Sequence, residues 1–130
     1  MEKSAQNLII PAVRRMELWL ASMQTDPGRV QNGICPVVIV SNNSVNAYGS
    51  VVTVVPCTSK HWRMVKPTDV CLHSCGFPSG IIAQCGQVTS LDKSCLLWQI
   101  GMVQNWYDRL AIQRALAAQL GIDLCVDLAA

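Results

Sequence analysis

Three short stretches of the sequence carry side chains that could do chemistry, and the first is "NGICPVV". Cys35 precedes Pro36, which favours an extended backbone before it, and the apolar run that follows indicates a buried strand. A position where a rigid strand meets an open loop often carries function. Because no histidine or acidic residue neighbours Cys35 in the sequence, we expect a buried thiol that fills space rather than a nucleophile.

The second stretch is "CLHSC", in which His73 stands between Cys71 and Cys75. This spacing suits half of a zinc site, but no second pair of Cys or His ligands follows and His61 is isolated. The sequence also lacks the glycine-rich motifs of nucleotide binding and the G-x-S-x-G motif of acyl transfer. We therefore expect no metal ion and no cofactor.

The third stretch is "SKHWR", in which Trp62 is flanked by His61 and Arg63 and follows Lys60. An aromatic ring among cations is the composition of a platform on which a nucleic-acid base stacks beside a bound phosphate. A solvated loop with one aromatic side chain packed on the fold is the alternative. The formal net charge of +2 is too small to indicate a nucleic-acid partner, so only local patches of this kind can.

The elements that must position these residues are mostly strands. The stretch "MELWLAS" alternates, which predicts Met16, Leu18 and Leu20 on one face and Glu17 and Trp19 on the other. Loops are predicted at 23–33, 41–50 and 60–67 from their turn-forming and polar residues. Further strands are predicted within 34–40, 51–59, 68–73 and 79–88. Residues 89–101 are predicted as a cap and turn, with Ser90 or Asp92 as the cap, followed by a short apolar run.

The C-terminal part has a helical period from Val103 to Leu120, and Gly121 suits the end of a helix. Arg114 falls inside the expected apolar stripe, either as a side chain that reaches solvent or as a partner for a carboxylate across a subunit contact. Several short strands followed by one helix indicate a mainly β fold, a small and strongly curved sheet or barrel. The predicted stripe consists of Val103, Trp106, Tyr107, Leu110, Ala117, Ala118 and Leu120.

Composition limits the organisation of the chain. Its 130 residues suit one domain, which we expect to span 16–130 with residues 1–15 as an N-terminal arm. With 51% hydrophobic and 14% charged residues, part of the apolar surface is expected to be buried against a second copy. No stretch is long and apolar enough to span a membrane, and the N-terminus does not resemble a signal peptide, so we expect a cytoplasmic protein without a membrane partner.

The order of these elements resembles the MazF/PemK family of toxin–antitoxin ribonucleases over about residues 16–122. The resemblance implies an SH3-like curved barrel with a C-terminal helix, as in MazF, PemK and CcdB, and a homodimer. It also implies metal-independent cleavage of single-stranded RNA, a cognate antitoxin, and operator DNA bound together with that antitoxin. The motifs that carry it run from Gly33 to Asn42, from Pro56 to Ser59, from Pro67 to Val70 and from Gln87 to Lys93.

The residues of the family's site are only partly present. Thr58 matches the threonine of that site, but Cys35 holds the place of the catalytic arginine. Val30 replaces the usual acidic residue of the first loop, and Thr89 replaces an arginine that many relatives carry. Arg29, in the same loop as Val30, is a candidate substitute for the missing cation. The predicted RNA contacts are Asn32, Ser59, Lys60, His61, Trp62, Arg63 and Gln87.

Two functions stay open at this point. A toxin of this family could still cut RNA with a rebuilt site. A catalytically silent scaffold could instead bind nucleic acid or an antitoxin without cleavage, because a cysteine supplies neither the charge nor the hydrogen-bond donors of an arginine.

Overall fold

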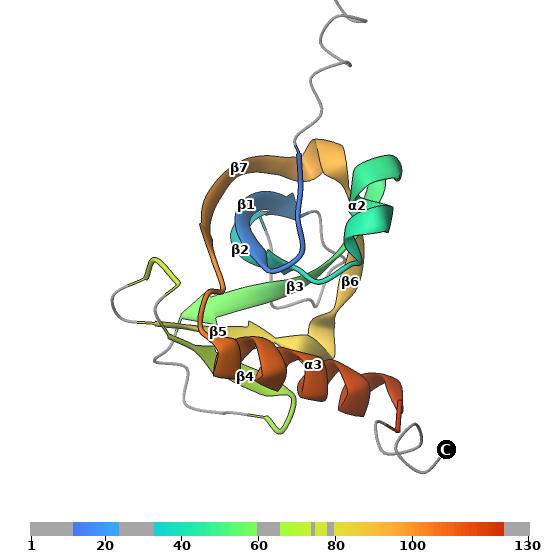
Figure 1. The fold of residues 1–130 in the computed structure, drawn as a ribbon. Coiled ribbons are helices and arrows are strands. Elements are labelled where there is room, and N and C mark those ends of the chain that lie inside the picture. The colour runs from blue at the N-terminus through green and yellow to red at the C-terminus, as the bar shows by residue number, and fades with distance from the viewer. Residues whose placement is uncertain (1–11, 24–32, 60–65, 74, 78–79, 124–130) are drawn as a thin grey trace, which may run out of the picture.

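The computed structural model describes residues 12–23, 33–59, 66–73, 75–77 and 80–123 (Figure 1). Within them the chain forms a mainly β fold in which one long helix follows the strands. The strands are β1 (Glu17–Met23), β2 (Gly33–Ile39), β3 (Val51–Ser59), β4 (Asp69–Leu72), β5 (Ile81–Gln84), β6 (Thr89–Asp92) and β7 (Leu96–Met102). The helices are α2 (Asn43–Tyr48), the 3-10 turns η1 (Cys85–Gln87) and η2 (Lys93–Cys95), and α3 (Trp106–Leu120).

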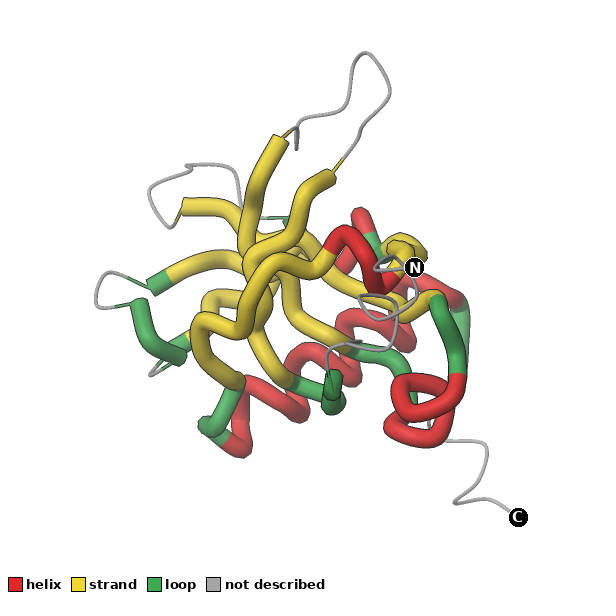
Figure 2. Tube along the Cα trace, turned by 90° about the horizontal axis from the view of Figure 1, so that it is seen from above, coloured by secondary structure: helices red, strands yellow, loops and turns green. Residues whose placement is uncertain are grey.

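All seven strands belong to one antiparallel sheet, and β3 is its centre. The sheet order is β4-β5-β3-β2-β1-β7, and β6 also pairs with β3. Figure 1 shows the strong curvature, with β1 and β2 curled above β3 and α3 running across the lower part of the molecule beside β4, and Figure 2 shows the strands crossing over the helix. Among the described residues, β4 and β7 each pair along one side only, so the curved sheet is not closed into a complete barrel.

The curvature buries both faces of the central strands. On β2, Val38 packs into the cluster beneath the sheet that α3 covers, whereas Val37 and Ile39 pack into a second cluster on the other face. The same holds for β1, where Glu17 and Trp19 are buried like Leu18. The prediction that Glu17 and Trp19 share the face opposite Leu18 is confirmed, but that face is buried too. The Trp19 Nε1–H donates to Glu17 Oε1 at 2.9 Å.

The helix α3 confirms the predicted C-terminal helix but only part of its predicted apolar stripe, in which Val103 and Ala117 are buried. Its N-cap is Asn105, whose side chain accepts from the backbone N–H groups of residues 107 and 108, and its C-cap Gly121 adopts φ 71°. The buried side chains are those of Asp108, Ile112, Ala115 and Ala117. Trp106, Tyr107 and Leu120 are exposed instead, as is Arg114. Apolar residues lie all round this helix, so their spacing did not identify the buried face.

A short helix, α2, occupies part of the predicted loop 41–50. Asn42 caps it by accepting from the Ser44 N–H. Asn46 is buried and its side chain both accepts from the Ser41 hydroxyl and donates to the Ser41 carbonyl. The buried Lys93 donates to the Asn46 carbonyl oxygen, so an amide and an ammonium group hold this helix against β3 and η2.

The stretch 89–101 also differs from its prediction. Residues 89–92 form β6 on β3, and residues 96–102 form β7 on β1, with η2 between them. Asp92 does act as a cap, because its carboxylate accepts from the Ser94 N–H and this bond lowers the pKa of Asp92. In the part of the chain that the structure describes, no helix is long and apolar enough to cross a membrane.

Candidate functional site

The sheet register places Cys35 and Thr58 in one row. Ile82 on β5 pairs with Thr58 on β3 and with Cys71 on β4. Extending the β2–β3 register, in which Val37 pairs with Pro56, by two residues sets Cys35 opposite Thr58. Paired residues of antiparallel strands share a face, so Cys35, Thr58, Ile82 and Cys71 lie across four neighbouring strands on one face.

Within this row the two predicted site residues differ in chemistry. Cys35 is only 6% exposed and packs among apolar side chains of β1, β2 and β3. Burial raises the pKa of the Cys35 thiol, so the group is neutral near pH 7 and supplies neither a cation nor a thiolate. Thr58 is half-buried, so its hydroxyl is the polar group that this row offers beside the thiol.

Most of the other predicted contacts lie outside the described residues. These are Arg29, Asn32, Lys60, His61, Trp62 and Arg63, together with Val30. Ser59 is described as the last residue of β3, paired with Ile81. Only the positions of the undescribed residues relative to the strands are known. Arg29 and Asn32 belong to the connection between β1 and β2, and residues 60–63 follow β3.

Gln87 lies apart from the row. It is in η1 and lines a polar pocket of about 200 Å³ with Lys66, Gln84 and Gln119. That pocket adjoins the C-terminal part of α3, whereas Thr58 pairs with Ile82 at the other end of β5. The strand pairs thus group Thr58 with Ile82 and Cys71, the extended register adds Cys35, and Gln87 lies with a different set of polar side chains.

The structure reveals one polar pair that the sequence analysis missed. The carboxylate of Asp108 accepts from the backbone N–H of His73 at 2.6 Å and lies 3.1 Å from its ring Nδ1. The carboxylate is only 7% exposed, whereas the His73 side chain is 67% exposed. The sequence suggested His73 only as a zinc ligand, and no spacing rule links it to a residue 35 positions later.

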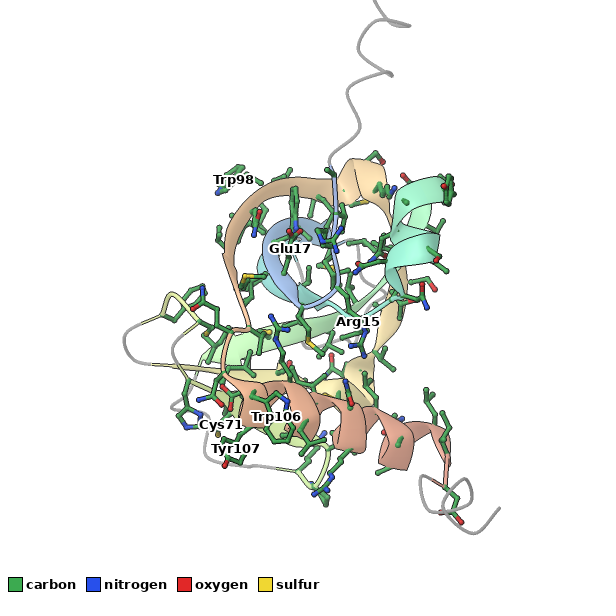
Figure 3. All side chains as sticks on the ribbon, viewed as in Figure 1. Arg15, Glu17, Cys71, Trp98, Trp106 and Tyr107 are labelled. Atoms are coloured by element: carbon green, nitrogen blue, oxygen red, sulfur yellow. The ribbon has the colours of Figure 1, made fainter. Side chains whose placement is uncertain are left out.

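Two exposed aromatic rings adjoin this pair. Trp106 and Tyr107, in the first turn of α3, are 65% and 75% exposed, with ring centroids 5.4 Å apart and planes at 82°. Figure 3 shows both at the start of α3, at the same end as Cys71. Trp106, Tyr107 and Asp108 are consecutive residues. The N-cap Asn105 fixes the backbone of this first turn by accepting from the N–H groups of Tyr107 and Asp108, and so orients all three side chains.

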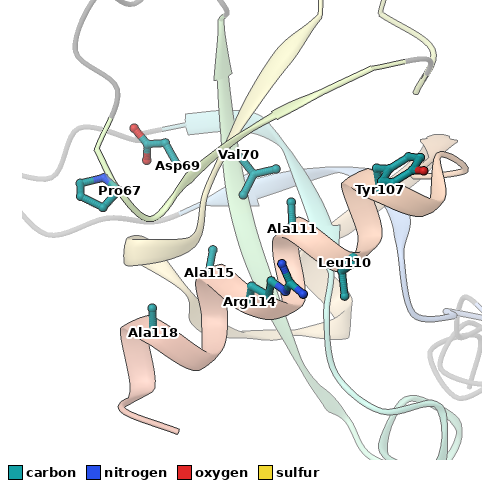
Figure 4. A pocket seen from close by; sticks show the side chains of 9 residues that line it. All are labelled: Pro67, Asp69, Val70, Tyr107, Leu110, Ala111, Arg114, Ala115 and Ala118. Carbon is teal, nitrogen blue, oxygen red and sulfur yellow. The ribbon is translucent and has the colours of Figure 1, made fainter. Parts of the chain in front are cut away.

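A groove runs along α3 on the side of β4. It has a volume of about 420 Å³, and Leu110, Ala111 and Ala115 form much of its apolar lining (Figure 4). Asp69 and Arg114 add charges of opposite sign, and Tyr107 closes the end near His73. Because β4 pairs only with β5 among the described strands, this groove follows an edge of the sheet.

The described residues contain no group of three or more His, Cys, Asp or Glu side chains that could hold a metal ion. In "CLHSC", Cys71 is exposed, Cys75 is buried and His73 Nδ1 faces Asp108. Burial, with a smaller contribution from the Asp108 charge, raises the pKa of the Cys75 thiol. That thiol is a poor metal ligand near pH 7 because ligation requires the thiolate.

Comparison with known proteins gives a consistent result. A family model described as "PemK-like, MazF-like toxin of type II toxin-antitoxin system" matches residues 14–120. No curated protein sequence matches the chain. Among solved structures, an endoribonuclease from a mycobacterial species is 25% identical, with a TM-score of 0.70 over 88% of this chain and 96% of that one.

Two further structures are similar. A mycobacterial endoribonuclease in complex with its cognate antitoxin is 28% identical, with a TM-score of 0.69 over 86% of this chain and 98% of that one. MazF from Deinococcus radiodurans has a TM-score of 0.71 at 21% identity, over 86% of this chain and 97% of that one, and so supports the fold.

Proposed function

This chain belongs to the PemK-like, MazF-like toxin family of type II toxin–antitoxin systems, and on that basis we propose that it is an endoribonuclease that cuts single-stranded RNA without a metal ion. The observation that carries the proposal is its 28% identity, over nearly the full length of both chains, to a mycobacterial endoribonuclease bound to its antitoxin. RNA in the cytoplasm is the proposed substrate.

The proposed chemistry uses Thr58 and a cation from a loop. Metal-independent cleavage of RNA needs a base for the proton of the 2′-hydroxyl and donors that stabilise the charge growing on the phosphate oxygens. Thr58 supplies a hydroxyl donor in the row described above. We assign the missing guanidinium to Arg29 or Arg63, because their loops adjoin the ends of β1 and β3 near Cys35 and Thr58.

The remaining RNA contacts are proposed from the same two loops. Asn32 lies next to β2, and Ser59, Lys60, His61 and Trp62 continue from Thr58. Gln87 is proposed as a more distant contact, because its pocket lies towards the C-terminal part of α3.

We also propose the protein partners. A cognate antitoxin is supported by the complex of the 28% identical endoribonuclease, and operator DNA would be bound together with that antitoxin. Two copies of this chain form a homodimer through the C-terminal part of the groove between α3 and β4, where Ala115 and Ala118 line it, so that Tyr107 at the other end of the groove stays exposed. Residues 16–130 are proposed as one domain and residues 1–15 as an arm whose described end packs on that domain, because Val13 is buried in the second cluster and Arg15 Nε donates to the Val40 carbonyl.

A specific observation favours a second candidate, a scaffold that binds without cutting. Cys35 stands in the place of the family arginine, and its burial keeps the thiol neutral. The loss of one such electrostatic contact typically lowers a rate about 10² to 10³-fold. A chain that lost it without replacement would keep the antitoxin surface and lose measurable cleavage.

The test combines growth and cleavage. Expression of the chain alone should stop bacterial growth, and the purified protein should cut unstructured RNA in single turnover with or without EDTA. Thr58→Ala should lower the rate about 10²-fold or more and restore growth. Thr53→Ala, a threonine of the same strand outside the row, is the matched control and should cut like the parent. Folded parent protein that neither cuts RNA nor stops growth would establish the silent scaffold instead.

A further inference from the structure

We propose that His73, held by Asp108, is the general base that takes the 2′-hydroxyl proton in this chain. The proposal rests on the ribonuclease function proposed above and names a residue for the step that Thr58 and an arginine leave open. It stands on three observations: the geometry of the pair, its place at the edge of the sheet, and the aromatic side chains beside it.

The geometry is that of an oriented imidazole. Asp108 binds the backbone N–H of His73 with one oxygen and faces ring Nδ1 with the other, at 2.6 and 3.1 Å. A carboxylate at Nδ1 favours the tautomer with its proton on that nitrogen, which leaves Nε2 as an acceptor. Since Asp108 is buried and the His73 side chain is 67% exposed, the charged partner is fixed while Nε2 stays accessible.

The surrounding structure fixes this pair from two sides. Asp108 lies in the first turn of α3, whose N-cap Asn105 also accepts from the Asp108 N–H. On the other side, β7 passes against the turn after His73, because a Cβ at Gly101 would come within 2.5 Å of the Cys75 carbonyl oxygen. A base held by a capped helix and a packed turn needs little reorganisation during the reaction.

The topology brings His73 to the same end of the strands as Thr58. Both β3 and β4 run antiparallel to β5, so they run parallel to each other, and Thr58 and Cys71 are level because both pair with Ile82. His73 follows Cys71 by two residues, just as the 60–65 loop follows Thr58 and Ser59. From strand spacing and rise, the Cα atoms of His73 and Thr58 are about 12 Å apart.

The aromatic pair gives the RNA a surface beside the base. Trp106 and Tyr107 precede Asp108 directly, and both rings are mostly exposed. Stacking of a nucleobase on an aromatic side chain stabilises the bound strand and tolerates different bases. A nucleotide stacked there would pass close to His73, which lies against the same helical turn.

His73 Nε2 takes the proton of the 2′-hydroxyl, and the 2′ oxygen forms a bond to the adjacent phosphorus. The bond from phosphorus to the 5′ oxygen breaks, and that oxygen leaves with the electron pair and takes a proton from water. The imidazolium then returns its proton to solvent, so the products are a 2′,3′-cyclic phosphate and a free 5′-hydroxyl, and no oxidant or metal is needed.

The experiment measures single-turnover cleavage of one RNA oligonucleotide by the parent, by His73→Ala and by Asp108→Asn. We expect His73→Ala to lower the rate about 10² to 10⁴-fold, as loss of a general base does. Added imidazole should restore part of that rate, which a merely structural histidine would not allow. Asp108→Asn should lower the rate with unchanged RNA affinity. Thermal unfolding of each variant checks that it is folded.

The other outcomes overturn the proposal in distinguishable ways. A His73→Ala variant that cuts within a few-fold of the parent, or one whose loss imidazole does not restore, rules out the base while the ribonuclease function stands. If Asp108→Asn does not fold, His73→Ala with imidazole still decides. A folded parent that cuts no RNA refutes the proposed function and this role of His73 together.

Discussion

At the scale of single residues, position 35 shows how a site can change its chemistry within an unchanged fold. The thiol of Cys35 packs with Trp19, Ala21 and Val37, and it lies level with Thr58 by register. A guanidinium at this place would have to reach past that cluster to stay in water, because an unpaired buried charge is costly. The position therefore constrains both activity and stability.

The first prediction concerns this position. Cys35→Arg should raise the single-turnover rate of RNA cleavage, because it restores a fixed cation beside Thr58, but only partly, since Val30 and Thr89 still differ from the family pattern. The same change should lower the free energy of unfolding by about 1–3 kcal/mol through overpacking. Chemical denaturation and cleavage assays on the same preparations measure both effects.

Cys35→Ser is the matched control. It removes the thiol and keeps the size, so cleavage should stay within a few-fold of the parent. Abolished cleavage in Cys35→Ser would make the thiol catalytic and contradict this account. A Cys35→Arg protein that cuts more slowly than the parent would mean that other groups have taken over the site.

The sequence predicted these residue environments unevenly. The buried state of Cys35 is confirmed, because an apolar run after an X-Pro step gives a local signal for a buried strand. The pairing of His73 with Asp108 had no local signal, because it depends on where α3 packs against β4. The roles of Thr58, Arg29 and the 60–63 loop in RNA cleavage stay predictions.

At the scale of elements, short helices depend on tertiary contacts more than long ones. With six residues, α2 is too short to be stable alone. Its buried Asn46 bonds to Ser41 in both directions, and Lys93 donates to its backbone carbonyl. These bonds explain why a stretch of turn-forming residues is helical.

The second prediction tests this anchoring. Asn46→Ala should lower the free energy of unfolding by about 1–3 kcal/mol, because it removes a buried amide and leaves the half-buried groups of Ser41 without that partner. Ser44→Ala, at an exposed position of the same helix, should change it by less than about 0.5 kcal/mol. Urea denaturation followed by tryptophan fluorescence measures both. Equal stability of the parent and Asn46→Ala would show that α2 is held by other contacts.

The elements that the sequence predicted are those with strong local patterns. The β-branched runs of β2 and β3 and the long helix α3 were all found. In β6 and β7, exposed and half-buried residues replace clean alternation, so their pairing with β3 and β1 could not be inferred from spacing. The buried face of α3 was predicted only in part for a similar reason: Trp106 and Tyr107 are apolar yet exposed, so the apolar spacing does not match the burial pattern.

At the scale of the whole molecule, large apolar side chains stay exposed on one copy of the chain. Leu120 and Ile122 at the end of α3 are 60% and 55% exposed, and the groove along α3 lies near them. Patches of this kind mark interaction surfaces. They are consistent with the homodimer proposed above.

The third prediction is therefore a dimer in solution. Sedimentation at micromolar concentration should give twice the mass of the 14.2 kDa chain, and Leu120→Asp should shift it towards the monomer. Val45→Asp, an exposed apolar position on α2, is the control and should leave the dimer intact. A monomeric parent would remove the dimer proposal, and an equal effect of both variants would remove the assigned surface.

The pairing of β1 with β7 has a consequence for the synthesis of the protein. Leu18 and Gly101 are partners although about eighty residues separate them. A chain growing from its N-terminus cannot form this ladder until β7 has left the ribosome, and contacts between such distant segments fold slowly. The turn after His73 packs on Gly101 through Cys75, so this turn would also reach its final packing late. A nascent chain would therefore lack the proposed base, and with it the proposed activity, until nearly all of its residues have been translated.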